Sequence, residues 1–168
     1  MQKSYSMLGV ILLLVTIVSA CSYSRANQQQ AADDAVGEIS QQQLLTHYPV
    51  FSNNYNAYSP SDKEVAAVAS LQGYSLVVLF GTWCHDSERE VPRLLKTLDA
   101  SGLDNLDIQL VAVDRKKRDP QGIALSHKLK YTPTFVLLKD GKELGRVIEK
   151  PTLTISQDLQ AIAAQTTP

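Results

Sequence analysis

The stretch that most constrains the fold of this chain is LVVLFGTWCHDSEREVPRLL, residues 76–95. It begins with a continuous run of β-forming apolar residues, which is the pattern of a strand covered on both faces. Gly81 permits a turn, after which apolar residues recur at helical spacing. These residues are Val91, Leu94, Leu95 and Leu98. A second apolar run follows at residues 107–114, so the order strand, helix, strand predicts a crossover between parallel strands.

The later part of the chain predicts a closing hairpin and a last helix. An Asp-Gly dipeptide at residues 140–141 separates two strand patterns, Thr134–Lys139 and Lys142–Ile148, which is a strong hairpin signal. We expect helices over Pro120–Lys130 and Thr152–Ala164. The pattern therefore predicts an α/β fold, with a central mixed sheet flanked by helices, a closing antiparallel hairpin and a C-terminal helix.

The domain is expected to begin with a helix near residue 61. Ser61 or Asp62 can cap this helix, and Glu64 lies in its first turn. Its apolar stripe would consist of Val65, Val68, Ala69 and Leu71. We expect residues 61–168 to form the domain and residues 38–60 to form an N-terminal extension, as an extra helix or strand on its edge.

The first twenty residues have the features of an export signal. Lys3 supplies the positive start, and Met7–Val18 is nearly all apolar. About a dozen apolar residues are too few to span a hydrocarbon core comfortably. We therefore predict a signal peptide over residues 1–20, with a transmembrane anchor as the alternative.

The end of this signal resembles the bacterial lipobox, because the small residues Ser19 and Ala20 directly precede Cys21. The resemblance implies cleavage by signal peptidase II and a mature chain whose Cys21 carries acyl chains, which anchor a protein firmly to a membrane. Ser22 would favour the outer membrane. We expect a lipid-anchored protein of the bacterial cell envelope that faces the periplasm. Residues 21–37, rich in Gln, Ala, Ser and Asp, predict a flexible tether.

The counts of charged residues and of cysteines limit the partners and the redox chemistry that fit this chain. Removing 20 of the 168 residues leaves 148, with 15 basic and 17 acidic side chains because only Lys3 is lost. This near balance argues against a nucleic-acid partner. The run RKKR at residues 115–118 is typical of a solvated loop and, less often, of a contact for an anionic partner. Cys21 and Cys84 are the only cysteines, so acylation of Cys21 would leave Cys84 as the only thiol, with no internal disulfide.

Cys84 is a candidate nucleophile because of its place between a strand and a helix. A cysteine at a helix start meets unpaired backbone N–H groups and the positive end of the helix dipole. Both stabilise the thiolate, which is the reactive form. Trp83 can shield one side of the sulfur. A protonated His85 would favour the thiolate and Asp86 would oppose it; alternatively, both are exposed residues of the helix start.

Ser87 lies one helical turn after Cys84, so its hydroxyl can face the sulfur and donate a hydrogen bond to the thiolate. Alternatively, it satisfies a backbone donor at the helix start. A serine cannot attack a mixed disulfide as a second thiol would. We expect no metal site from Cys84, His85 and Asp86, because adjacent residues at a helix start rarely converge on one ion, and we expect no cofactor.

These residues resemble the thioredoxin superfamily, whose signature is a strand, Trp-Cys-x-x-Cys and a helix. The chain has FGTWCHDS, with Ser87 in place of the second cysteine, and Pro92 at the position of a helix-kinking proline. YTPTF resembles the loop whose cis-proline faces the reactive cysteine. The resemblance implies that Pro133 is that proline and that Thr132 is the backbone contact for substrate. It covers about Ser61–Ala164.

Two departures from the family accompany the missing cysteine. The buried acid of the family's strand falls here on Val78, and a glycine that is common after the last strand is replaced near Glu149. The absence of the acid and of the second thiol argues against ordinary dithiol turnover. The fold inference does not depend on either position.

The leading hypothesis is monothiol exchange with protein or small-molecule thiols and disulfides, of reductase or isomerase type. Its catalytic residues would be Cys84, Ser87 and His85, and an external thiol would resolve the mixed disulfide. Its substrate contacts would be Trp83, Thr132 and Pro133. The alternative is a non-catalytic module that uses the same groove to hold an extended segment.

Overall fold

The structure is a computed structural model in which residues 33–103 and 106–165 are described. The predicted signal peptide, the lipidation site Cys21 and residues 22–32 of the tether lie outside the described residues. Within the described ranges, no helix is long and apolar enough to cross a membrane.

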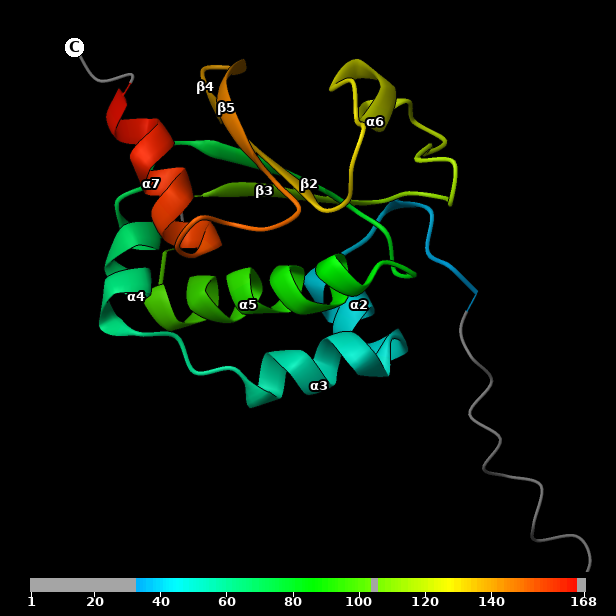
Figure 1. Ribbon diagram of the computed structural model, residues 1–168, viewed down its shortest axis with the longest axis horizontal. Helices are drawn as coiled ribbons and strands as arrows, with labels where there is room; N and C mark the ends of the chain where they lie inside the picture. The colour runs from blue at the N-terminus through cyan, green and yellow to red at the C-terminus, as the bar shows by residue number, and fades with distance from the viewer. Residues whose placement is uncertain (1–32, 104–105, 166–168) are drawn as a thin grey trace, which may run out of the picture. The chain divides into compact units, whose positions relative to one another are not determined.

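A five-stranded mixed sheet forms the centre of the domain (Figure 1). Its strands are β1 (Gly37–Glu38), β2 (Ser75–Phe80), β3 (Asp107–Ala112), β4 (Thr134–Lys139) and β5 (Lys142–Ile148). Their order across the sheet is β1-β3-β2-β4-β5, and only β2 and β3 run parallel. The predicted crossover and the closing hairpin are both present, with the hairpin strands at their predicted bounds.

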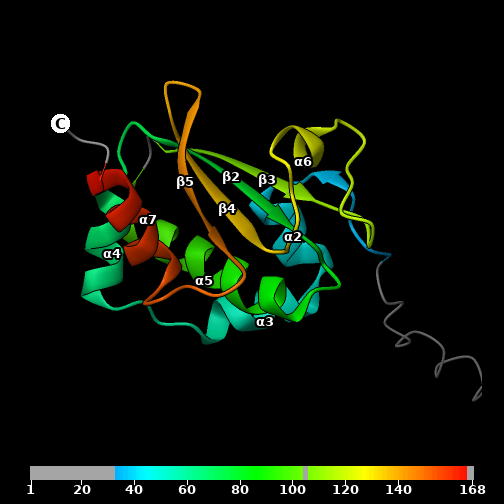
Figure 2. The same cartoon turned by 45° about the horizontal axis from the view of Figure 1, so that its top comes forward.

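Six helices complete the described part of the chain. They are α2 (Gln41–His47), α3 (Pro49–Ala57), α4 (Asp62–Ala69), α5 (His85–Ser101), α6 (Ile123–Ser126) and α7 (Ile155–Gln165). Figures 1 and 2 show α5, α7, α4, α3 and α2 on one face of the sheet and α6 on the other. The helices therefore flank the sheet, as predicted.

Strand β2 lies at the centre of the sheet and sends alternate side chains to its two faces. Leu76, Val78 and Phe80 join the large apolar cluster on the side of α5, whereas Val77 and Leu79 join a smaller cluster that includes α6. All five side chains are buried. The continuous apolar run thus forms a strand covered on both faces, as its pattern predicts.

Helix α5 follows β2 and presents its predicted apolar stripe to the sheet. The stripe residues Val91, Leu94, Leu95 and Leu98 are all buried. Pro92 lies within the helix and is buried too. The helix ends at Gly102, whose φ of +62° is the left-handed conformation that terminates helices.

The extension before the domain forms β1, α2 and α3. Ser40 caps α2 in a reciprocal capping box with Gln43, which satisfies amide donors at the helix start. Helix α3 packs on α5, and the Phe51 ring lies 5.9 Å from the Phe80 ring, centroid to centroid. The extension therefore covers the face of the sheet that carries α5.

The last residues of the predicted tether also contact the domain. The Ala35 N–H donates to Thr82 Oγ1 at 3.0 Å, and Asp34 forms an ion pair with Arg115 at 2.8 Å. Residues 33–37 thus lie against the loops that follow β2 and β3.

The helix predicted over Pro120–Lys130 is much shorter than expected. The Asp119 carboxylate accepts hydrogen bonds from the amides of Ile123 and Ala124, so α6 begins only there. The helix stops at Ser126, and Lys128 two residues later has a φ of +53°, which interrupts helical geometry.

Two smaller differences concern α7 and α4. Helix α7 begins at Ile155 rather than Thr152, because the Thr154 hydroxyl accepts a hydrogen bond from the amide three residues on. In α4, Ala67 is buried and the predicted stripe residue Ala69 is exposed.

Glu149 follows β5 with a left-handed backbone, at a φ of +57°. Its N–H donates to the Pro133 carbonyl at 2.8 Å, so this conformation supports the loop that precedes β4. A residue with a Cβ is disfavoured in this region, which glycine adopts readily.

We expect Glu149→Gly to raise the free energy of unfolding by about 0.5–1 kcal/mol, because relief of the left-handed strain exceeds the added entropy of the unfolded chain. Urea denaturation measures the change. The matched control is Lys150→Gly, at a neighbour without a positive φ, which should lower stability. A Glu149→Gly chain no more stable than the Lys150→Gly chain would contradict this account.

Candidate functional site

Cys84 lies at the N-cap of α5, directly after the turn that leaves β2. Its φ of −104° and ψ of 119° are extended, and its N–H donates to the Gly81 carbonyl at 3.0 Å. Its side chain is half-buried. No side chain caps the first amides of α5, so these donors are free to stabilise negative charge at the sulfur.

The Cys84 thiol faces the loop that enters β4. Its Sγ donates to the Thr132 carbonyl at 3.1 Å. The peptide bond between Thr132 and Pro133 is cis, and both residues are buried. The structure thus brings together Cys84, Thr132 and Pro133 from segments 48 residues apart, as the resemblance implies.

Trp83 is held by a backbone contact and by a close approach to the turn. Its indole N–H donates to the Val113 carbonyl at 3.0 Å. A Cβ on Gly81 would lie only 2.5 Å from Cε2 of this ring, so the glycine is needed for the close approach. The Arg115 guanidinium and the Lys117 ammonium lie 5.6 and 6.0 Å from the ring centroid. The ring is therefore bordered by two cations.

Ser87 is fully buried, and its Oγ accepts a hydrogen bond from the Gly81 N–H at 3.3 Å. This contact joins the first turn of α5 to the end of β2. Among the described residues, the Cys84 sulfur has its hydrogen bond with Thr132 and none with Ser87. A hydrogen bond from Ser87 to the thiolate stays a prediction.

His85 and Asp86 each pair with a residue one turn along α5. The His85 side chain is 97% exposed, and its Nδ1 lies 2.9 Å from a Glu88 carboxylate oxygen. Asp86 forms an ion pair with Arg89 at 2.8 Å. Hydrogen bonding to Glu90 raises the pKa of Arg89, burial opposes this, and the hydrogen bond with Asp86 adds to the rise. The charges on the start of α5 are thus paired within the helix.

Val78 occupies the strand position where the family carries a buried acid. It is fully buried and pairs across the sheet with Leu110 and Phe135. The region beneath the site is therefore apolar at this position. Within the described ranges, no group of three or more His, Cys, Asp and Glu side chains could hold a metal ion.

The sequence does not predict that Asp34, Ala35 and Val113 contact residues at or next to the site. Thr82 and Arg115 receive the segment before β1, and Val113 offers its carbonyl to Trp83. These contacts join residues 30 to 81 positions apart and use backbone atoms or single ion pairs, for which sequence patterns carry little signal. The nearest signal is the basic run directly after the second strand pattern.

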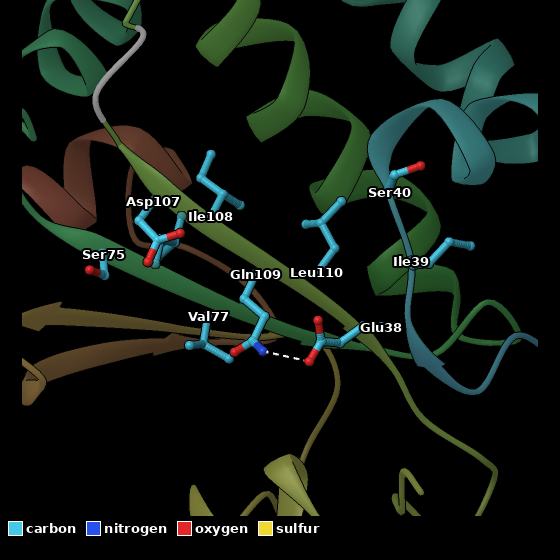
Figure 3. Close-up of a pocket in the computed structure, with 10 residues that line it drawn as sticks. Glu38, Ile39, Ser40, Ser75, Val77, Asp107, Ile108, Gln109 and Leu110 are labelled. Atoms are coloured by element: carbon cyan, nitrogen blue, oxygen red, sulfur yellow. Dashed lines mark hydrogen bonds between the residues drawn. The ribbon is translucent and has the colours of Figure 1, made fainter. Parts of the chain in front are cut away.

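A separate hollow of about 520 Å³ lies at the sheet edge, where β1 covers only one end of β3 (Figure 3). The Gln109 amide donates to the Glu38 carboxylate there at 2.8 Å. The hollow is lined by Ser75 and Asp107, where β2 and β3 begin, whereas Cys84 follows the end of β2. It is therefore remote from the thiol.

No protein-family model matches the chain, and no curated protein matches it. Among solved structures, an HIV epitope-scaffold is similar to this chain, with a TM-score of 0.60 and 14% sequence identity. The match covers 78% of this chain and 94% of the scaffold chain. A protein of unknown function from Pseudomonas aeruginosa is also similar, with a TM-score of 0.53 and 18% sequence identity. That match covers 77% of this chain and 81% of the Pseudomonas chain. At these identities the likeness is one of fold alone.

The fold is thioredoxin-like. The sheet order, the crossover through α5, the closing hairpin and the C-terminal helix confirm the predicted fold class. Mitochondrial thioredoxin 3 from Saccharomyces cerevisiae, in its oxidized form, is 25% identical over 60% of this chain and 92% of its own, at a TM-score of 0.37. In this chain the helices α2 and α3 precede α4, the helix that was predicted to begin the domain.

We expect Gly81→Ala to displace the Trp83 ring, because the new Cβ would overlap it, and to lower the free energy of unfolding by about 1–3 kcal/mol. Trp83 is the only tryptophan, so its fluorescence emission should move to longer wavelength in the folded variant. The matched control is Gly102→Ala, whose Cβ meets open space at a strained φ. It should lower stability and leave the emission unchanged. Equal emission in both variants would contradict the close approach.

Proposed function

We propose that this thioredoxin-like domain is a monothiol exchange protein of the bacterial cell envelope, anchored through a lipidated Cys21 at the outer membrane and facing the periplasm. The observation that carries the proposal is the placement of Cys84 Sγ, at the uncapped start of α5 and 3.1 Å from the Thr132 carbonyl. The amides at the helix start favour the thiolate, which is the attacking form.

The reaction has two exchange steps. The Cys84 thiolate attacks a substrate disulfide, forms a Cys84–substrate disulfide and releases the other substrate sulfur as a thiolate. A thiol from another molecule, or a further thiol of the substrate, then attacks this mixed disulfide and restores the Cys84 thiolate. In the first route the external thiol takes over the substrate sulfur as a new mixed disulfide, and a second equivalent of that thiol then releases it; the substrate disulfide is reduced to two thiols and two external thiols are oxidised to one disulfide. In the second route the substrate's own thiol forms a new disulfide within the substrate, so the substrate's disulfides are rearranged.

The neighbours of the sulfur have different proposed roles. Thr132 and Pro133 would align an extended substrate segment beside Cys84, and Trp83 would cover one side of it. Ser87 holds the turn through the Gly81 N–H, so it would position the sulfur as well as donate to the thiolate. The exposed ring of His85 would meet the approaching substrate.

The second candidate is a non-catalytic binding module that uses the groove around Trp83 and Pro133. The apolar Val78 and the engagement of Ser87 with the backbone favour this alternative, because neither position offers acid or thiol chemistry. The two candidates differ in one requirement: exchange needs the Cys84 sulfur, and groove binding does not.

The first test is the rate of alkylation of Cys84. We expect iodoacetamide to modify Cys84 at neutral pH about tenfold faster than it modifies an unstructured cysteine peptide, because the helix start stabilises the thiolate. Mass spectrometry of the Cys84 peptide measures the rate. A Cys84→Ser chain gives the background from Cys21. A rate no higher than that of the peptide would exclude the catalytic proposal.

The second test concerns the missing resolving thiol. Treatment with a small disulfide should leave a stable Cys84 adduct in the natural chain. In Ser87→Cys, the introduced thiol lies one helical turn from Cys84, and side chains one turn apart on a helix are neighbours. We expect the new thiol to attack the mixed disulfide on Cys84, release the small thiol and form a disulfide with Cys84 in the same molecule.

Non-reducing mass spectrometry follows the adduct, and Ser87→Ala should retain it. An adduct that is lost equally from the natural chain and from Ser87→Ala would contradict the monothiol scheme. Absence of any adduct, together with envelope partners that still bind Cys84→Ser, would favour the binding module.

A further inference from the structure

The segment between β3 and β4 begins and ends at the site. It begins with Val113, whose carbonyl accepts a hydrogen bond from Trp83, and near its end lies Thr132, whose carbonyl accepts one from Cys84. Figure 1 shows this segment, with α6, on the side of the sheet opposite α5. The two ends of this segment therefore adjoin the site.

A hollow of about 410 Å³ lies in this segment. Its apolar lining includes Leu129 and Leu125, the latter 82% exposed. Its basic lining consists of Lys116, Lys117, Arg118 and Lys128. We call this hollow, with its six named residues, the basic groove.

Three of the four cations in the basic groove have no ion pair among the described residues. Arg118 pairs with Asp114 at 2.9 Å, and the Asp119 carboxylate is engaged by the amides that begin α6. No described carboxylate pairs with Lys116, Lys117 or Lys128. Lys116 and Lys117 are thus available to an acidic partner, and Lys128, which forms no salt bridge with a described residue, adds to the lowering of the Glu143 pKa that Arg146 chiefly causes.

Lys117 connects the basic groove to the site. Its ammonium lies 6.0 Å from the centroid of the Trp83 ring, and Trp83 directly precedes Cys84. A carboxylate bound at Lys117 would therefore lie beside the ring of the residue that directly precedes Cys84. The exposed Leu125 gives the same groove a place for an apolar side chain.

We infer that the basic groove selects the substrates of Cys84 by binding an acidic segment with an apolar residue, next to the disulfide that Cys84 attacks. The inference rests on the proposed exchange function. A protein segment fits better than a lipid surface, because the groove is concave and partly apolar and because Lys117 in it lies beside Trp83, the residue before Cys84. Complementary charge acts mainly on the rate of association, so the selectivity falls as salt rises.

The test compares two peptides of equal length, each with one cysteine activated as a thiopyridyl disulfide. One carries Glu and Leu beside the cysteine, and the other carries Lys and Leu. We expect the full chain to react roughly tenfold faster with the acidic peptide at low ionic strength, and less selectively at high salt. Pyridinethione absorbance gives the second-order rate constants.

Replacing groove lysines by glutamate tests whether the preference for the acidic peptide arises in the basic groove. Lys116→Glu combined with Lys128→Glu should abolish the preference for the acidic peptide. The matched control is Lys63→Glu combined with Lys142→Glu, two exposed lysines outside the groove, which changes net charge equally and should retain the preference. A preference lost equally in both double variants would overturn the inference, because it would then reflect net charge alone.

A cysteine-free acidic peptide separates this inference from the proposed function. We expect its binding to change Trp83 fluorescence, in the natural chain and in Cys84→Ser alike. Equal reaction rates for the two activated peptides would overturn the inference and leave monothiol exchange intact. No reaction with either peptide, together with groove-dependent fluorescence changes, would overturn the exchange proposal and support acidic binding. A groove-dependent change only with phosphatidylglycerol vesicles would overturn the inference in favour of a membrane surface.

Discussion

The pairing of β2 with both β3 and β4 is the constraint on which the site depends. Because β3 runs parallel to β2, its carboxyl end lies beside the end of β2, and the Val113 N–H donates to the Phe80 carbonyl at 2.8 Å. Because β4 runs antiparallel, its amino end lies at the same place, with Thr134 opposite Leu79. The turn with Trp83 and Cys84 therefore meets a carbonyl from each neighbouring chain segment.

This topology explains why part of the site follows from the sequence. The apolar run of β2, the start of α5 and the Thr-Pro pattern before β4 each carry a strong local signal, and sheet pairing brings their ends together. The helix start at Cys84 and the approach of the Thr132–Pro133 loop to it could therefore be predicted, whereas the hydrogen bond from Cys84 to the Thr132 carbonyl was not. The partner of Ser87 could not be, because both the sulfur and the Gly81 N–H lie within reach of a side chain on the first turn of the helix.

Other features escaped prediction for identifiable reasons. Helix α6 is short because one carboxylate, Asp119, satisfies the amides at its start and a left-handed residue follows its end, and both effects override helical periodicity. Strand β1 has two residues, too few for an alternating pattern to appear. The cation–π contacts of Arg115 and Lys117 with the Trp83 ring depend on the path of the loop after β3, and composition alone does not specify that path.

The contact of Asp34 and Ala35 with the loops around Trp83 sets a limit on where the proposed enzyme can act. Asp33 is twelve positions after Cys21, and a fully extended chain of twelve residue steps spans at most about 40 Å. With a lipid anchor at Cys21, the entry point of the chain, and with it the neighbourhood of Cys84, would stay within that distance of the bilayer. A tether of this length would keep the thiol close to the membrane and so raise the effective concentration of membrane-bound substrates around it. Proteins farther from the membrane would have to diffuse to the anchored domain.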